Sequence, residues 1–189
     1  QPACEVHILR LRGEGKDLPV STSRDAALTA VAPCGPLITA HDDGLSLSFT
    51  AQSEAEAQPE WADCVDAYLY EPGAAVLKAG AFKTVAVRYG LKKLHPHSHL
   101  YTGPAYLPHF PGRKSKPERV FGCSKADLKQ LRTDSPQANL TIRNFPSSVD
   151  ALRKKLKLRE GGTAYIFATT LADGKHVLIV CRKAEKGEE

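Results

Sequence analysis

The sequence predicts an α+β protein made of two small, sandwich-like α/β domains. A length of 189 residues with 42% hydrophobic and 25% charged residues is typical of a globular chain long enough for two cores. The C-terminal third alternates strand-like and helix-like segments in the order βαβαββ. A stretch rich in proline and histidine, residues 95–116, precedes it. We therefore expect one domain at 1–115 and a second at 116–189.

Three strands are expected near the start of the chain. Residues 6–12 alternate apolar with polar side chains. Residues 36–40 and 45–50 flank Asp42-Asp43-Gly44, and a turn of this composition between two apolar runs indicates a β-hairpin. We therefore expect one strand followed, after a gap, by a hairpin.

The middle of the chain is expected to be helical and then extended. Residues 51–63 are polar and acidic, which predicts a loop or a short surface helix. Residues 72–90 begin with a proline, are mostly apolar and end in a glycine, which together predict one helix. Residues 95–116 hold four prolines and predict an extended connection.

The second domain is expected to open with a strand and a capped helix. Residues 119–123 predict a short strand. Ser124, with Asp127 three residues later, resembles a capping box and predicts a helix over 126–134. Residues 138–145 predict the second strand of this domain.

A basic helix and a hairpin are expected to complete the chain. Ser147 and Asp150 repeat the capping pattern, and apolar residues then recur at helical spacing, which predicts a helix over 147–158. Residues 163–171 and 176–182 flank an Ala-Asp-Gly turn, which indicates a β-hairpin.

Charge is divided unevenly along the chain. Residues 1–80 carry a net charge of −7 and residues 81–189 carry +12, within a total of +5. A basic segment of this size favours a polyanionic partner, because clustered Lys and Arg gain from releasing phosphate counterions. Packing of the acidic half against the basic half is the alternative, and the sequence leaves both open.

Candidates for nucleic-acid contact lie around the second helix of the C-terminal domain. Cations, an amide and the Phe145 ring occur close together there, and these groups hold RNA phosphates and stack bases. A solvated amphipathic helix with Phe145 in the core is the alternative. The candidates are Arg143, Asn144, Arg153, Lys154 and Lys157, with Lys92 and Lys93 as an extension of the same surface.

No catalytic or cofactor-binding residue is predicted in this chain. Gly13-Glu14-Gly15 follows a strand, as in nucleotide-binding loops, but it lacks a third glycine and Pro19 follows it. Four histidines have a spacing that zinc could use, although no carboxylate lies within their run. A metal site is therefore only a third hypothesis. These histidines are His95, His97, His99 and His109.

The cysteine pattern and the hydropathy bear on the compartment. Five cysteines are scattered without a CxxC pair, which favours free thiols in a reducing cytoplasm. No apolar run is long enough to cross a bilayer, so no membrane partner is expected. The chain starts at Gln1 and contains no methionine, and we expect it to be a fragment or a processed product.

Three segments, 68–103, 137–162 and 163–183, resemble the C-terminal region of a known family, the bacterial class I SAM-dependent methyltransferases that end in a THUMP-like domain. The resemblance is carried by YLYEPGAAVLKAGAFKTVAVRYGLKKLHPHSHLYTG (68–103), QANLTIRNFPSSVDALRKKLKLREGG (137–162) and TAYIFATTLADGKHVLIVCRK (163–183). It implies that EVHILRLRGEGKDL (5–18) opens a ferredoxin-like domain and that the C-terminal domain is THUMP-like. The glycine-rich SAM loop of the family has no match here, which places SAM in the parent protein.

The resemblance implies two partners, RNA (tRNA or rRNA) and the catalytic domain of the same polypeptide. Together with the charge pattern, it predicts a non-catalytic, substrate-recognition fragment of an RNA-directed methyltransferase. The alternative is a docking or dimerisation module of the methyltransferase that binds no nucleic acid.

Overall fold

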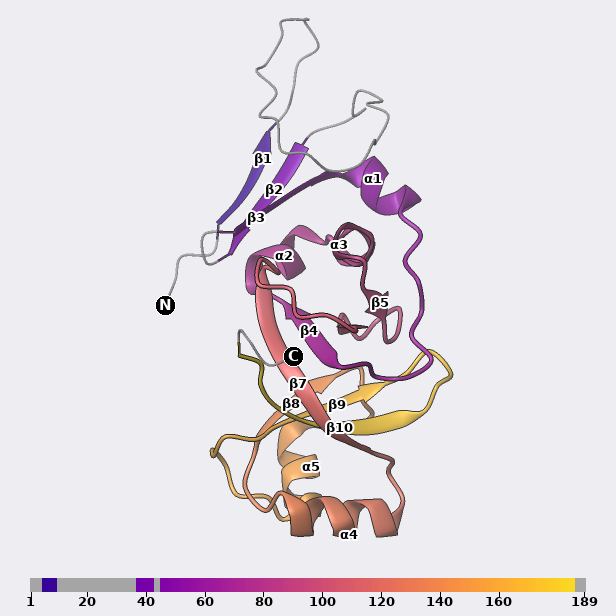
Figure 1. Ribbon diagram of the computed structural model, residues 1–189, viewed down its shortest axis with the longest axis vertical. Coiled ribbons are helices and arrows are strands. Elements are labelled where there is room, and N and C mark those ends of the chain that lie inside the picture. Colours follow the sequence, from indigo (N-terminus) through magenta and orange to yellow (C-terminus); the bar gives the residue numbers. More distant parts are fainter. Residues whose placement is uncertain (1–4, 10–36, 43–44, 186–189) are drawn as a thin grey trace, which may run out of the picture.

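The computed structural model describes residues 5–9, 37–42 and 45–185, and these form two β-sheets and five helices (Figure 1). The predicted α+β class is confirmed. The expected turn at 43–44 and the Gly-x-Gly segment lie outside the described residues.

The first sheet is small and antiparallel. It contains β1 (Glu5–Leu9), β2 (Leu37–Asp42) and β3 (Leu45–Thr50) in the order β1-β2-β3. The expected strands of the hairpin are therefore confirmed. Ala40, Leu47 and Phe49 are buried and join the same core as the helices that follow.

Three short helices lie in the middle of the chain, and the single helix predicted over 72–90 is wrong. The helices are α1 (Ala51–Glu56), α2 (Ala74–Ala79) and α3 (Phe82–Tyr89). Gly80 adopts a left-handed conformation (φ 81°) and its backbone N–H bonds to carbonyls of α2, so it ends that helix. A glycine at this point therefore acts as a stop signal within an otherwise helical pattern.

The second sheet has seven strands in the order β5-β6-β4-β7-β10-β9-β8, and all neighbours are antiparallel except β8 and β9. Its strands are β4 (Tyr68–Pro72), β5 (Lys92–Lys93), β6 (Tyr101–Gly103), β7 (Gly112–Phe121), β8 (Asn139–Arg143), β9 (Tyr165–Thr170) and β10 (His176–Lys183).

The long strand β7 corrects the extended connection predicted over 95–116. Ser115 pairs with Leu69 of β4 on one side and with Lys183 of β10 on the other. The division expected near this residue thus falls inside a strand that both halves share. The strand tolerates Pro117 because the register shifts next to its partner Cys181, and prolines within sheets are confined to such irregular or edge positions.

The C-terminal half confirms the predicted order βαβαββ, with α4 (Lys125–Asp134) and α5 (Val149–Leu156). Ser124 and Asp127 form the expected capping box. The capping residue of α5 is corrected by one position, because the side chain of Ser148, and not of Ser147, accepts the backbone N–H of Ala151 at 3.2 Å. The helix therefore begins at Val149 and not at residue 147.

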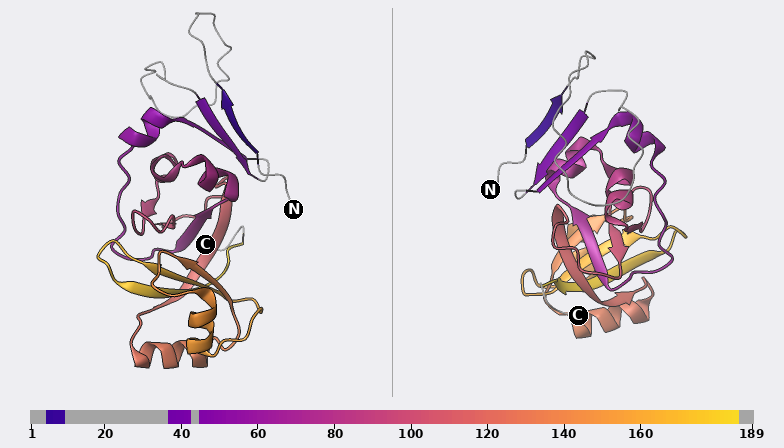
Figure 2. Two further views of the ribbon diagram at one scale, coloured as in Figure 1. Left: turned by 180° about the vertical axis from the view of Figure 1, so that it is seen from behind. Right: turned by 45° about the horizontal axis from the view of Figure 1, so that its top comes forward.

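The large sheet buries both of its faces. Helices α4 and α5 cover one face at the end of the molecule away from the small sheet (Figure 2), where Leu131, Leu152 and Leu156 join Ile166 and Leu178 in one core. A second core on β4, β9 and β10 includes Leu69, Leu94, Leu100, Phe167 and Ile179. The sheet is therefore a middle layer that fixes both the helical end and the loops around β5.

Candidate nucleic-acid interface

The two edges of the seven-stranded sheet meet through polar contacts. Arg143 ends β8 at one edge, yet its Nη2 lies 2.7 Å from Oε1 of Glu71 in β4. Nδ2 of Asn144 lies 2.9 Å from Nδ1 of His95, which follows β5 at the other edge. The sheet is therefore strongly coiled, as twisted sheets are. Asn144 has a φ of 54°, a conformation that asparagine tolerates better than most residues.

Glu71 is the centre of these contacts. It is 6% exposed, and its second oxygen lies 3.5 Å from Nη1 of Arg113, whose guanidinium also packs 5.7 Å from the ring centre of Tyr165. A buried carboxylate of the acidic half thus meets two cations of the basic half. At this point the two halves neutralise each other within one chain, and Arg143 is committed to an ion pair.

Glu71→Gln should lower the free energy of unfolding by about 1–2 kcal/mol, because glutamine keeps the shape but removes the charge that both arginines contact. The cost stays moderate because the arginine side chains are 48% and 39% exposed and can be hydrated. Urea denaturation measures it. Glu118→Gln is the control, since Glu118 pairs with Arg182 at an exposed position and should change stability by less than about 0.5 kcal/mol. Equal effects of the two substitutions would show that the ion pairs of Glu71 with Arg113 and Arg143 do not stabilise the fold.

Exposed cations gather at the C-terminal end of α5, and we call them the α5 basic end. Their side chains form no ion pair with any residue of the described part of the chain. Between 123 and 160 the sequence has nine Lys and Arg against four Asp and Glu, so the surroundings are also basic. The members of the α5 basic end are Lys154, Lys155, Lys157 and Arg159.

A shallow pocket of about 270 Å³ lies beside the α5 basic end. Lys155 lines it together with Phe145, His176, Ser147 and the exposed Cys123. Phe145 packs on the core beneath and meets the His176 ring edge to face, with 5.5 Å between the ring centres. Phe145 therefore contacts the core, and its ring also lines a pocket next to a cation.

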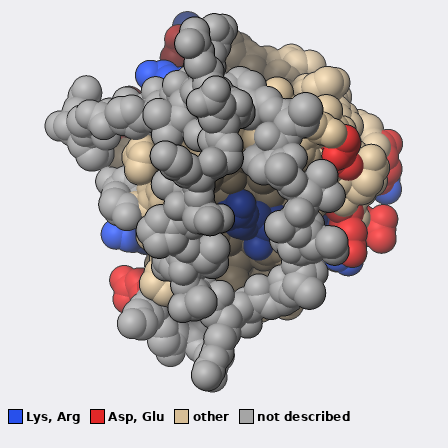
Figure 3. Space-filling view, turned by 90° about the horizontal axis from the view of Figure 1, so that it is seen from above, with Lys and Arg blue, Asp and Glu red and all other residues tan. Residues whose placement is uncertain are grey.

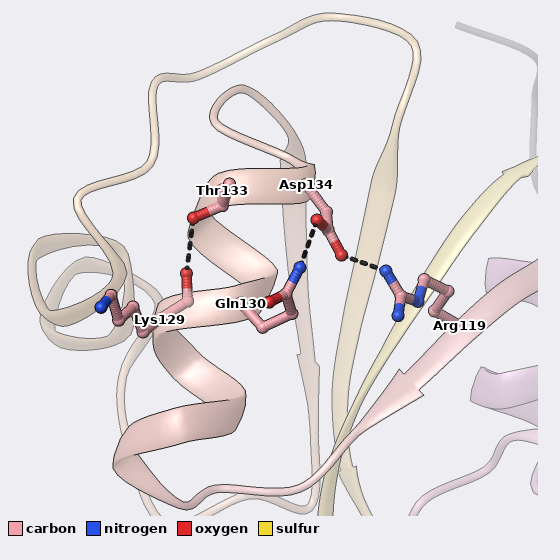
Figure 4. Close-up of polar contacts among 5 residues, drawn as sticks. All are labelled: Arg119, Lys129, Gln130, Thr133 and Asp134. Atoms are coloured by element: carbon pink, nitrogen blue, oxygen red, sulfur yellow. Dashed lines mark hydrogen bonds and ion pairs between the residues drawn. The ribbon is translucent and has the colours of Figure 1, made fainter.

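Three of the four acidic residues between 123 and 160 have other partners, and the fourth, Asp150, is exposed in the first turn of α5. Asp134 pairs with Arg119 of β7 and accepts a 2.7 Å hydrogen bond from Gln130, whereas Lys129 points away from both (Figure 4). Asp127 caps α4, and Glu160 pairs with Arg153 at 3.7 Å. Asp150 lies at the opposite end of α5 from the α5 basic end, so the acidic residues of this segment either have a partner or lie in the first turn of the helix.

The other predicted site residues differ in how exposed they are and in whether they form ion pairs. Arg153 is only 20% exposed and pairs with Glu160. Lys92 is exposed and lies 3.8 Å from Glu60. Lys93 is buried, at 1% exposed, and cannot extend a surface. The structure thus brings Arg153, Lys154 and Lys157 together on α5, and it places Arg143 and Asn144 at the sheet edge and Lys92 and Lys93 on β5.

The uneven charge along the chain does not appear as a single sign of charge at the end of the molecule that carries the small sheet. Seen from the end that carries the small sheet, Lys and Arg lie among Asp and Glu in the part of the surface that is described (Figure 3). Acidic and basic residues thus share this end, and the α5 basic end lies on the far side of the molecule from the small sheet (Figure 2).

Two of the four histidines, His95 and His99, are partly buried and make side-chain contacts in this structure, whereas His97 and His109 are exposed. His99 stacks on Phe82, with 3.8 Å between ring centres, and burial lowers the pKa of His99 to about 4 with a further contribution from the charge of Lys93. His95 contacts Asn144, and burial lowers its pKa also. Among the described residues, no three His, Cys, Asp or Glu side chains are grouped as a metal site.

Three residues of interest were missed in the sequence. The half-exposed Trp61 and the buried Glu71 give no local signal, because both depend on contacts between segments far apart. Lys155 lies off the apolar stripe of α5, as Lys154 does, so the helical spacing is a signal that adds it to the candidate residues.

Within the described residues, no helix is long and apolar enough to cross a membrane.

The comparisons with known proteins agree with this architecture. Residues 68–111 match a ferredoxin-like domain family and residues 113–183 match a THUMP domain-like family, so the two matches meet at Gly112. The crystal structure of a proposed methyltransferase from Porphyromonas gingivalis W83 is 50% identical in sequence, with a TM-score of 0.71. The alignment covers 75% of this chain but only 35% of that one. No curated protein matches the chain.

Proposed function

Residues 68–111 belong to the ferredoxin-like domain family and residues 113–183 to the THUMP-like domain family, and on this premise we propose that the chain is the RNA-recognising accessory region of a methyltransferase. Its role is to hold structured RNA for a catalytic domain of the same polypeptide. That domain, with its SAM site, lies outside the chain, which spans about a third of the similar structure.

The α5 basic end carries this proposal. Four exposed cations without acidic partners among the described residues form a surface that gains free energy by replacing the counterions of a phosphate backbone. The adjoining pocket offers the Phe145 and His176 rings for an unpaired base. Phosphate contacts position the RNA, and ring contacts add affinity for unstacked bases.

The charge complementarity expected for a docking or dimerisation module is used inside the chain, because Glu71 pairs with Arg113 and Arg143. That observation favours RNA over a second copy as the partner of the basic half. The four cations of the α5 basic end have no ion pair among the described residues and so keep their charge for a partner.

Replacing Lys154, Lys155 and Lys157 together by Gln should weaken binding of a tRNA transcript at least about tenfold at fixed salt, because three phosphate contacts are lost. The fold should remain, since the three side chains are exposed and Gln is a good helix former at positions 154 and 155. Lys157 is the left-handed C-cap residue of α5, and Gln, like Lys, has a single unbranched Cβ there. Fluorescence anisotropy with labelled RNA measures the affinity, and circular dichroism checks the fold.

The matched control replaces Lys78, Lys175 and Lys183 by Gln. These residues are also exposed, lie on other elements and give the same change in net charge. We expect the control to change affinity less than about threefold. If both triple variants bind RNA equally well, the proposed interface is wrong.

A further inference from the structure

A cavity of about 340 Å³ lies beside β5 and the start of α3, away from the α5 basic end. Its volume falls at the lower end of the range of small-ligand sites. Aromatic, proline and charged side chains line it, among them Glu54, Trp61, Phe82, Lys83, Lys93 and Pro96.

Lys93 is the unusual member of this lining. The residue is 1% exposed, and its Nζ has no hydrogen-bond partner among the described residues. The ammonium lies 5.0 Å from the ring centre of Tyr101 and 5.9 Å from that of Phe82, and the charge of Glu54 also favours its charged form, but no described group accepts a hydrogen bond from it. A buried donor without an acceptor costs free energy, and an acceptor atom on a ligand would recover that cost.

Trp61, unlike the buried and charged Lys93, gives the cavity an exposed apolar surface. Its side chain is 45% exposed although tryptophan is among the largest apolar residues. An exposed indole at the wall of a cavity is a stacking platform for a flat ring. The ligand that suits both residues is therefore a flat ring with a hydrogen-bond acceptor at its edge.

Glu54 decides which kind of acceptor fits. Its carboxylate accepts the backbone N–H groups of Lys83 at 2.7 Å and Thr84 at 2.8 Å, so it stays fixed at the cavity wall. The charge of this carboxylate offsets that of Lys93, so a neutral carbonyl oxygen suffices as the acceptor and no second negative charge is needed there. Lysine is a common partner of O6 and N7 of guanine, while adenine presents an amino donor at position 6.

We propose that this cavity binds a guanine base, with its ring on Trp61 and its O6 and N7 toward Nζ of Lys93. The inference rests on the proposed function, because it makes the cavity a second contact for RNA. Burial lowers the pKa of Lys93 to about 8, so the preference for guanine should weaken as the pH rises above that value.

The test uses Trp61, the one tryptophan of the chain, as a fluorescent reporter at the site. GMP should quench its emission with a Kd of about 1 mM or below, and AMP, a purine of the same size, should bind at least about fivefold more weakly. Lys93→Met should remove the difference between the two nucleotides. Lys92→Met is the matched control and should retain the difference, because Lys92 points to solvent on the same short strand.

The single-stranded hexanucleotide AAGAAA tests whether the guanine comes from an RNA strand or from a free nucleotide, and AAAAAA is the control without guanine. Tighter binding of the guanine-containing hexamer than of GMP identifies an RNA strand as the ligand, and equal affinity identifies a free nucleotide. Absence of quenching by GMP, equal affinity for GMP and AMP, or an unchanged preference in Lys93→Met would each overturn the guanine site. These results would leave tRNA binding through the α5 basic end intact, so failure of this inference is distinct from failure of the proposed function.

Discussion

Replacing Gly112 by alanine is expected to lower the free energy of unfolding by about 3–4 kcal/mol, because the added methyl group would collide with backbone atoms. A Cβ at this position would lie 2.2 Å from the carbonyl oxygen of Glu71 and 2.7 Å from the backbone N of Gly73. Gly112 also has a φ of 150°, which residues with a side chain rarely adopt. The collision falls where β7 pairs with β4, which is where the ferredoxin-like and THUMP-like segments join.

Urea denaturation of the full chain measures this cost. Gly174→Ala is the control, because Gly174 also has a positive φ, of 83°, but a Cβ added there would have no described atom within 4 Å outside the adjoining residues of the turn. The control should cost about 1 kcal/mol. If Gly112→Ala costs no more than the control, β4 and β7 are not in the register described.

Lys93→Met should raise the free energy of unfolding by about 2–3 kcal/mol at pH 7. Burial lowers the pKa of this lysine from 10.5 to about 8, and each unit corresponds to about 1.4 kcal/mol of cost for keeping the folded protein charged. Methionine has a similar length and no charge, so it fills the same aromatic surroundings without that cost. A residue that destabilises the fold at its own position is expected where function requires it.

The pH dependence of this gain has a definite sign. Below pH 8 the lysine is charged in both states, and the full cost falls on the folded state. Between pH 8 and 10.5 the unfolded chain still binds the proton and the folded chain does not, so wild type gains stability and approaches the variant. Denaturation should therefore show a large difference in the free energy of unfolding between wild type and Lys93→Met at pH 7 and a small difference at pH 10. Loss of stability at pH 7 would show that Lys93 makes a stabilising contact, and Lys92→Met should show no such trend.

The sequence predicted best what depends on neighbouring residues. The capping box of Ser124 with Asp127, the hairpin around the Ala-Asp-Gly turn and the phase of α5 are all local patterns, and the structure confirms them. The one-residue error at Ser148 has the same origin, because two adjacent serines offer equivalent caps and only packing selects one.

The contacts that the sequence did not predict join distant segments. Arg143 reaches Glu71 only because the sheet coils across five strands, and no pattern around either residue encodes that approach. Lys92 and Lys93 are both candidates for an exposed surface in the sequence, but the two-residue period of a strand points one of them outward and the other inward. That alternation was the available signal that the two lysines have different roles.

The salt dependence of RNA binding tests the central claim most directly. Affinity for a tRNA transcript is measured between about 50 and 300 mM salt for wild type and for the variant with Lys154, Lys155 and Lys157 replaced by Gln. Each phosphate contact contributes about 0.7–0.9 to the slope of log affinity against log salt. The account predicts that the slope of the variant is shallower by about 2–3. Equal affinities and equal slopes for the two proteins would contradict it.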